Sequence, residues 1–341
     1  MPCVYGVPGR GRGCVHARGS SMADKHYHKL HREIAAMASL KGPYVAELYG
    51  TFEDADNVYM IMEYCEGGDL YKTMMLHGGC LDEHFVCMEI IAPLLRVLGK
   101  MHDVMALIHR DIKPENIFLA RNHRLRLGDF GLAIDVSQEI PFSRSGTLDY
   151  MAPEVLRNPA SRMQESPLVT KAHLEAKGIR SYTSAVDVWA VGILAYELVC
   201  GKPPFEVEDE NKTASLIMYS NSIHFPSKHS TPWGDFVRQA LLKDPASRPT
   251  ASALLHHPWI TSHLQCALSL PCTAAAAAAA AAADISTAKQ QCEVTHAIEP
   301  DTHSSHSYST TTASHQIKAT TSMTSEVTAT PVELLHQQGG W

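Results

Sequence analysis

The amino-acid sequence predicts an α+β fold in which a small lobe with β-strands precedes a larger, mainly helical lobe. Three observations support this prediction. Residues 24–39 have the apolar spacing of a helix, residues 45–65 have the pattern of two strands joined by a turn, and the long apolar segments after residue 80 have helical character. The 341 residues are sufficient for one large or two ordinary domains with a substantial core.

The small lobe contains one expected helix and one expected hairpin. In residues 24–39, Leu30, Ile34 and Met37 recur on one helical face. The segments VAELYGTFED and NVYMIMEYC are separated by an acidic turn next to an asparagine, which is the pattern of a β-hairpin. These segments predict a reduced β-sheet accompanied by one helix.

The larger lobe begins with a long expected helix. Residues 81–103 carry acids near the start and Lys100 and His102 near the end, an arrangement that the helix dipole favours. Residues 185–201 are apolar nearly all round, which predicts a buried helix that ends at Gly201, before two prolines.

Domain boundaries follow from changes in composition. Periodic apolar segments give way near residue 262 to an alanine run and then to a stretch rich in Ser, Thr and His. We therefore predict a folded domain over residues 23–262. Residues 1–22 are expected to be irregular or a remnant glycine-rich segment, and residues 263–341 a mostly disordered, low-complexity tail.

Charge and cysteine content narrow the class of protein. The formal net charge of −7 argues against a general nucleic-acid binder. No apolar run approaches the ~18 residues that span a membrane, and the first twenty residues lack the apolar core of a secretory signal. The nine cysteines are dispersed without C-x-x-C spacing, so we expect reduced thiols and a cytoplasmic and/or nuclear location.

Two short motifs supply the groups that phosphoryl transfer requires. The segment HRDIKPEN, residues 109–116, provides Asp111, Lys113 and Asn116, and the later segment DFG begins with Asp129. The reaction needs a carboxylate to accept the proton of an attacking hydroxyl, oxygen ligands for Mg²⁺ and a positive charge near the transferred group. Asp and Asn offer the hard oxygen atoms that Mg²⁺ prefers.

With these motifs the chain resembles the eukaryotic protein kinase family, whose fold is two-lobed. The resemblance implies that the small lobe reaches about residue 66 and that the larger lobe begins at about residue 67. The resemblance implies that Asp111 is the catalytic base and that Lys113 contacts the γ-phosphate. It implies further that Asn116 and Asp129 ligate Mg²⁺ and that ATP is the phosphoryl donor. His109 and Phe130 correspond to members of the family's hydrophobic stack, which Met37 and Leu48 are expected to continue.

Other family motifs follow in the expected order. Downstream, GTLDYMAPEVL supplies Glu154, DVWAVG supplies Asp187 on the buried helix, and DPASRPT supplies Arg248 as the expected ion-pair partner of Glu154. Upstream, Glu33 in LHREI corresponds to the glutamate of helix C. In MEYCEGGDLY, the resemblance implies that Met62 is the gatekeeper, that Glu63 and Cys65 offer backbone groups to adenine, and that Asp69 faces the ribose.

The acceptor is expected to be a protein serine or threonine. Lys113 lies two residues after Asp111, and Thr147 corresponds to the threonine that braces these two residues in serine/threonine kinases. Glu115, with weaker support from Asp69, could favour basic residues N-terminal to the acceptor; the equal alternative is that both are ordinary loop acids. Several segments, among them LHREI and LYGTFED, most resemble the Aurora-like group.

Control by phosphorylation is also implied. Arg110 precedes the catalytic aspartate, the arrangement in which an arginine can bind a phosphate on the activation loop. Ser143 lies three residues before Gly146, where related kinases carry the activating phosphate, so we expect phosphorylated Ser143 to dock on Arg110. An upstream kinase or an activator protein is the implied partner. Residues 157–185 are longer than usual and predict a surface insertion beside the peptide-binding region.

The resemblance fails at one essential position. The family requires a lysine on a V-A-I-K-like strand, paired with the helix-C glutamate, and no such strand is evident upstream of Glu33. Three interpretations remain: a truncated or mis-spliced gene product, a weakly active kinase with charge borrowed from Arg18 or Lys25, and a pseudokinase that acts as a scaffold. The intact catalytic-loop and Mg²⁺ positions argue against the last.

Two further features of the N-terminal region remain open. The glycines Gly9, Gly11 and Gly13 in PGRGRGCV are interpreted as weak ATP contacts of a remnant glycine-rich loop, although the third glycine comes one residue early. A zinc site on His26, His28 and His31 is the one non-kinase alternative. No cysteine or carboxylate has fitting spacing, so helix-surface histidines are favoured.

Overall fold

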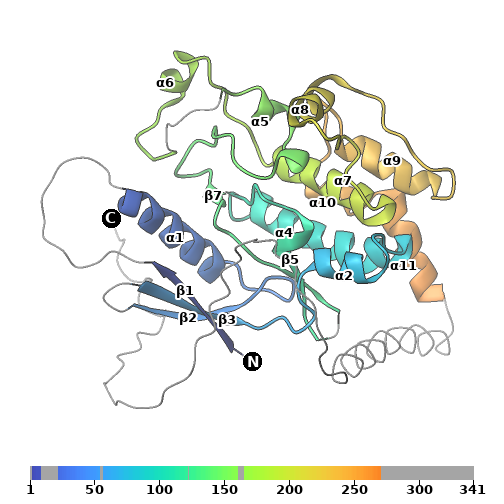
Figure 1. Ribbon diagram of the computed structural model, residues 1–341, viewed down its shortest axis with the longest axis horizontal. Helices are drawn as coiled ribbons and strands as arrows, with labels where there is room; N and C mark the ends of the chain where they lie inside the picture. Colours follow the sequence, from blue (N-terminus) through green and yellow to red (C-terminus); the bar gives the residue numbers. More distant parts are fainter. Residues whose placement is uncertain (1, 9–21, 54–56, 122, 160–164, 270–341) are drawn as a thin grey trace, which may run out of the picture. The chain divides into compact units, whose positions relative to one another are not determined.

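The computed structural model describes residues 2–8, 22–53, 57–121, 123–159 and 165–269 (Figure 1). By its internal contacts the chain divides into two units, Met1–Leu264 with Thr330–Trp341, and Gln265–Ala329. Nearly all described elements belong to the first unit. The described part of the second unit is the C-terminal end of helix α11.

Among the described residues, the strands are β1 (Pro2–Pro8), β2 (Leu48–Glu53), β3 (Asn57–Glu63), β4 (Leu107–Ile108), β5 (Ile117–Leu119), β6 (Leu125–Leu127) and β7 (Ile134–Asp135). The helices are α1 (Met22–Ser39), α2 (Leu70–Leu76), α3 (Glu83–Phe85), η1 (Val86–Ile91), α4 (Ala92–Asp103), η2 (Pro114–Asn116), η3 (Leu148–Tyr150), α5 (Pro153–Leu156), α6 (Lys171–Glu175), α7 (Ala185–Cys200), α8 (Glu210–Tyr219), α9 (Thr231–Ala240), α10 (Ala251–Leu254) and α11 (Pro258–Ser269). The mixture confirms the predicted α+β class, with a protein-kinase-like arrangement.

The N-terminal part is a three-stranded antiparallel sheet accompanied by helix α1. The strand order is β1-β3-β2, so β3 is central. Val58 and Met60 of β3 are buried in one cluster with Leu30 of α1, which lies beside the sheet in Figure 1. The predicted hairpin and the predicted helix are therefore both present, and the alternating apolar residues of β3 hold them together.

Strand β1 differs from the expectation for residues 1–22. Its seven residues pair antiparallel with β3 from Pro2 opposite Glu63 to Pro8 opposite Asn57. The strand PCVYGVP precedes helix α1 in the order of the described elements. It lies beside the central strand and contains no lysine. The glycines Gly9, Gly11 and Gly13 follow this strand and lie outside the described residues.

Short strands position the loops of the larger lobe. Strand β4 leads into the HRDIKPEN loop, and its antiparallel partner β7 follows the DFG segment. Between them, β5 and β6 form a hairpin. The two motifs are thereby brought side by side, and the backbone N–H of Gly128 donates to the carbonyl oxygen of Asn116 at 3.0 Å.

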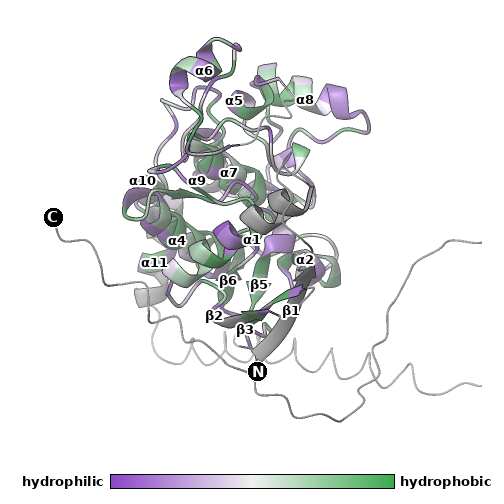
Figure 2. Ribbon diagram, turned by 90° about the vertical axis from the view of Figure 1, so that its left-hand side faces the viewer, coloured by the Kyte–Doolittle hydropathy of each residue, from purple (hydrophilic) through white to green (hydrophobic). Residues whose placement is uncertain are grey.

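The helical core is built around α4 and α7. The predicted helix over residues 81–103 starts at Asp82, whose carboxylate accepts hydrogen bonds from the N–H groups of His84 and Phe85, and continues through α3, the π-helical turn η1 and α4. Helix α7 is almost entirely buried, is hydrophobic along its length (Figure 2), and ends at Gly201 with φ of +89°, as predicted.

The expected insertion, residues 157–185, contains helix α6 and packs against the activation loop, which we define as residues 137–150. Leu174 and Ile179 of the insertion form a buried cluster with Phe142 of this loop. The insertion therefore supports the loop through an apolar contact of its own. In the described part of the chain, no helix is long and apolar enough to cross a membrane.

Candidate active site

The predicted catalytic loop is assembled around Asp111. Lys113 Nζ lies 2.9 Å from Asp111 Oδ2, and the hydroxyl of Thr147 donates to Asp111 Oδ1 at 3.3 Å. Lys113 Nζ also donates to Thr147 Oγ1 at 3.0 Å. The threonine therefore braces the carboxylate and the ammonium together, in the arrangement expected of a serine/threonine kinase.

Asn116 is oriented by the same aspartate. Its Nδ2 donates to both the backbone oxygen and Oδ2 of Asp111, each at 2.8 Å. Because the amide nitrogen is committed to Asp111, Oδ1 is the Asn116 atom that can ligate a cation. Asp129 follows Gly128, which is hydrogen-bonded to Asn116, and is held in the left-handed region with φ of +52°. The carboxylate of Asp129 is exposed and accepts a hydrogen bond from the N–H of Gly131 at 3.2 Å.

His109 supports the DFG segment as a neutral ring. Burial lowers the pKa of His109, and its Nε2 lies 3.1 Å from the carbonyl oxygen of Gly128. Nε2 must therefore carry the proton, while Nδ1 accepts from the N–H of Asp111 at 3.3 Å. The ring makes an edge contact with Phe130 at a centroid distance of 4.9 Å. Met37 is buried in the same apolar cluster as Phe130, and Leu48 packs against that cluster.

Asp187 anchors the catalytic loop from helix α7. Its Oδ1 accepts from the N–H of Arg110 and its Oδ2 from the N–H of His109, both at 2.8 Å. His102 Nε2 lies 2.8 Å from Oδ2. Although burial opposes ionisation, the hydrogen bond and the charge of His102 hold the pKa of Asp187 below its ordinary value. The carboxylate therefore stays charged inside the core.

The expected adenine and ribose residues have structural partners of their own. The Glu63 carboxylate forms an ion pair with Arg126 at 2.8 Å, and the carbonyl oxygen of Cys65 accepts from the N–H of Gly68 at 3.1 Å. Burial raises the pKa of the Cys65 thiol to about 11, so this thiol is protonated at neutral pH. Asp69 caps helix α2 through the N–H of Lys72 at 2.8 Å. Asp69 Oδ2 lies 2.8 Å from Lys72 Nζ, so both carboxylate oxygens of Asp69 are engaged by helix α2.

The N-terminal candidates are described only in part. Glu33 lies half-buried on α1. The glycine-rich segment and Arg18 lie outside the described residues, and the side chains of Lys25, His26 and His28 are not described. Among the described residues, no group of three or more His, Cys, Asp or Glu side chains could hold a metal ion.

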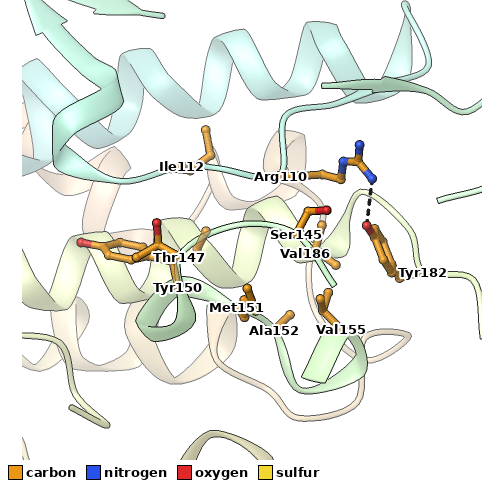
Figure 3. A pocket seen from close by; sticks show the side chains of 11 residues that line it. Arg110, Ile112, Ser145, Thr147, Tyr150, Met151, Ala152, Val155, Tyr182 and Val186 are labelled. Carbon is orange, nitrogen blue, oxygen red and sulfur yellow. Dashed lines mark hydrogen bonds between the residues drawn. The ribbon is translucent and has the colours of Figure 1, made fainter. Parts of the chain in front are cut away.

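Arg110 is nearly buried and is engaged by several acceptors. Its Nη1 donates to Ser143 Oγ at 3.3 Å, which brings together the two residues predicted to interact, and to Tyr182 Oη at 3.0 Å. Figure 3 shows its guanidinium turned toward Tyr182. Both residues line a small pocket, and Thr147 is another of its lining residues. Nη1 also lies 2.7 and 2.6 Å from the two carboxylate oxygens of Glu165. Sequence reasoning missed Glu165, because the insertion has no motif that identifies it.

A second ion pair stabilises the end of the activation segment, as expected. Arg248 Nη1 donates to Glu154 Oε1 at 2.9 Å and Nη2 to Oε2 at 3.2 Å. The Arg248 side chain is fully buried, and its guanidinium lies over the ring of Trp189. This bidentate pair attaches helix α5 to the loop that precedes α10.

Glu197 is a further residue that sequence reasoning missed. It lies near the end of α7, is 8% exposed, and its Oε2 has no hydrogen-bond partner among the described residues. Burial, followed by the charges of Glu115, Glu206 and Asp149, raises the pKa of Glu197 to about 8. The visible signal was a single acid in an otherwise apolar helical run, AYELVCG.

Comparison with known proteins agrees with this geometry. A family model described as "Protein kinase domain" matches residues 15–260, so strand β1 lies outside the match. Aurora kinase C of Mus musculus is 33% identical over 247 residues, which cover 72% of this chain and 79% of that protein. The Aurora kinase of Encephalitozoon cuniculi is 32% identical over 236 residues (69% and 78%), and that of Saccharomyces cerevisiae is 34% identical over 233 residues (68% and 57%). The chain therefore belongs to the protein kinase family, and within it to the serine/threonine kinases of Aurora type.

Proposed function

We propose that this chain transfers the γ-phosphoryl group of ATP, with Mg²⁺, to serine and threonine hydroxyls of protein substrates. The observation that carries the proposal is the network of Asp111, Lys113, Thr147 and Asn116. It joins a carboxylate, an ammonium group and an oriented amide within hydrogen-bond distance of one another.

The residues present fit Mg²⁺ and the phosphates of ATP. Asn116 Oδ1 and the exposed carboxylate of Asp129 are hard oxygen donors on two adjacent loops, and they would hold the cation. When bound, Mg²⁺ neutralises charge on the phosphate oxygens. Asp111 orients the acceptor hydroxyl and accepts its proton, while Lys113 stabilises the negative charge on the transferred group.

The proposed substrate class is supported by the acidic surroundings of Glu197. One carboxyl oxygen of Glu197 has no partner among the described residues, and burial and the charge of Glu115 help to raise its pKa to about 8, so a cation near this group would favour the ionised form of Glu197. We therefore propose substrates with an arginine or lysine N-terminal to the acceptor residue. Asp69 contributes less, because it caps helix α2.

The absence of a lysine from β1 supports one second candidate, a catalytically impaired scaffold that binds nucleotide without turnover. The strand beside β3 has the sequence PCVYGVP, so the charge that the family places near the α- and β-phosphates must come from elsewhere in an active enzyme. Arg18 and Lys25 are the candidates.

The test measures binding and turnover separately. The first experiment compares the thermal unfolding of wild type and Asp129→Ala, each as the full chain, with and without Mg²⁺-ATP. The second compares wild type and Asp111→Asn in the transfer of labelled phosphate to an arginine-containing serine peptide. We expect a Mg²⁺-dependent rise in Tm that Asp129→Ala abolishes, and transfer that Asp111→Asn reduces by at least about 100-fold. Binding without transfer would support the scaffold instead, and no binding would contradict both.

A further inference from the structure

Arg110 already holds an anion in the unphosphorylated chain. Its side chain and that of Glu165 are each 5% exposed, and the carboxylate lies within 2.7 Å of Nη1 through both oxygens. Although burial opposes both charges, the ion pair holds the pKa of Glu165 below its ordinary value and the charge of Glu165 helps to raise the pKa of Arg110. Both groups are therefore charged at neutral pH.

Glu165 also binds the activation loop directly. Its Oε1 accepts hydrogen bonds from the backbone N–H groups of Phe142 and Ser143, each at 2.9 Å. One carboxylate therefore joins the arginine of the catalytic loop to two backbone groups of the activation loop. Several donors converging on one anion is the arrangement that a phosphate group would otherwise create.

The insertion holds this loop through neutral contacts as well. Tyr182 Oη donates to the carbonyl oxygen of Ser143 at 2.9 Å, and Asn158 Nδ2 donates to that of Phe142 at 3.0 Å. The buried ring of Phe142 packs with Leu174 and Ile179. These contacts place Glu165 in a fixed position relative to Arg110.

Helix α1 is attached to the same site. Arg32 of α1 donates to the backbone oxygen of Glu165 at 2.8 Å and forms an ion pair with Glu139 of the activation loop. Two cations, Arg32 and Arg110, therefore face two carboxylates. A phosphate on Ser143 would add about −1.5 to −2 charge beside Glu165, where the cations are already matched.

We infer that Glu165 is a positioning residue that takes the place of an activation-loop phosphate, so that the loop is ordered without phosphorylation of Ser143. Glu165, which belongs to the insertion, thereby keeps Arg110 in place. The expected docking of phosphorylated Ser143 on Arg110 is then needed to order the loop only when Glu165 is removed. The inference rests on the proposed kinase function only where activity is the readout.

Hydrogen–deuterium exchange of the full, phosphatase-treated chain tests the structural part without any need for activity. The variants are Glu165→Gln, Ser143→Ala and the matched control Glu175→Gln, an exposed glutamate of helix α6 in the same insertion. We expect wild type, Ser143→Ala and Glu175→Gln to protect the amides of residues 142 and 143 equally, and Glu165→Gln to lose about 10- to 100-fold of that protection. Rapid exchange at these amides in phosphatase-treated wild type would overturn the inference, even if Glu165→Gln did not fold.

Peptide phosphorylation supplies the functional part. With phosphatase-treated proteins we expect Ser143→Ala to retain the wild-type rate and Glu165→Gln to lose about 10- to 100-fold in kcat. Phosphoserine incorporated at position 143 should restore Glu165→Gln and give no gain in wild type, a response that a merely structural role of Glu165 would not produce. A loss in Ser143→Ala as large as that in Glu165→Gln would contradict the inference. An inactive wild type whose amides are protected would contradict the kinase proposal alone.

Discussion

The carboxylate of Asp187 accepts a hydrogen bond of 2.8 Å from the backbone N–H of Arg110, a residue whose φ is +71°. A non-glycine residue in the left-handed region is strained, so the catalytic loop keeps this conformation only because a buried acceptor stabilises it. The same loop presents Asp111 one residue later. The geometry of Asp111, the proposed catalytic base, therefore depends on a charge inside helix α7.

Asp187→Asn should consequently destabilise the protein and reduce its activity. An amide has a single acceptor oxygen, so its NH₂ group would face one of the N–H donors that the carboxylate now satisfies. We expect a loss of about 3–5 kcal/mol in the free energy of unfolding, measured by urea denaturation. The control is Asp103→Asn, an exposed aspartate, which should stay within about 1 kcal/mol of wild type. Equal stability of the two variants would contradict the anchoring role.

Arg248→Lys should be destabilising although it retains the charge. A lysine cannot reproduce the bidentate contact with Glu154 or the planar stacking on Trp189. We expect a loss of about 2–4 kcal/mol by the same measurement, because the fully buried site leaves one carboxylate oxygen unsatisfied. Arg157→Lys, at an exposed position nearby, should change the free energy of unfolding by less than about 0.5 kcal/mol. A comparable effect at both positions would refute this explanation.

Thr147→Val should lower kcat with little change in the KM for ATP. The substitution keeps the shape of the side chain and removes the hydroxyl that joins Lys113 to Asp111. We expect kcat for peptide phosphorylation to fall by about 10-fold or more, because Asp111 and Lys113 both lose their hydrogen bond to the Thr147 hydroxyl. Thr147→Ser retains the hydroxyl and should restore most of the rate; if it behaved like Thr147→Val, the methyl group would be the important feature.

Glu197 should make stability depend on pH. Its folded-state pKa of about 8 lies above the ordinary value of 4.5, so the folded chain binds a proton that the unfolded chain releases between these values. The free energy of unfolding should therefore decrease as pH rises from about 5 to about 8, by a few kcal/mol relative to Glu197→Gln. Chemical denaturation at several pH values measures this difference. If wild type and Glu197→Gln had parallel pH profiles, the raised pKa would be wrong.

Parts of the site that depend on one short loop were predictable from sequence. Asp111, Lys113 and Asn116 lie within six residues, so their mutual contacts follow from the local turn once the motif is identified. The buried helix α7 and its end at Gly201 follow from an apolar run and a left-handed glycine. Asp69 shows the limit of such reasoning, because the same residue suits a helix cap and a ribose contact.

The remainder depends on long-range packing that local pattern does not encode. Glu165 and Arg110 are in contact although they are 55 residues apart in the chain. Glu165 lies in an insertion whose sequence has no helical or strand periodicity that would predict its position. Strand β1 escaped prediction because two prolines and a glycine in seven residues weaken the strand pattern. Its pairing with β3 joins residues that are 49 to 61 positions apart in the chain, so only the folded sheet identifies it as a strand.

The position of β1 bears on how the protein resists self-association. Because β1 covers β3 along seven register pairs, the strand that carries the buried Val58 and Met60 is internal, and β1, an outer strand of the described sheet, carries a proline at each end. Proline cannot donate to an added strand, so the two ends of β1 are poor positions for pairing with another chain. A chain shortened to begin after residue 8 would expose the backbone of β3 beside Val58 and Met60. Residues 2–8 thus shield the central strand from pairing with another chain as well as completing a sheet.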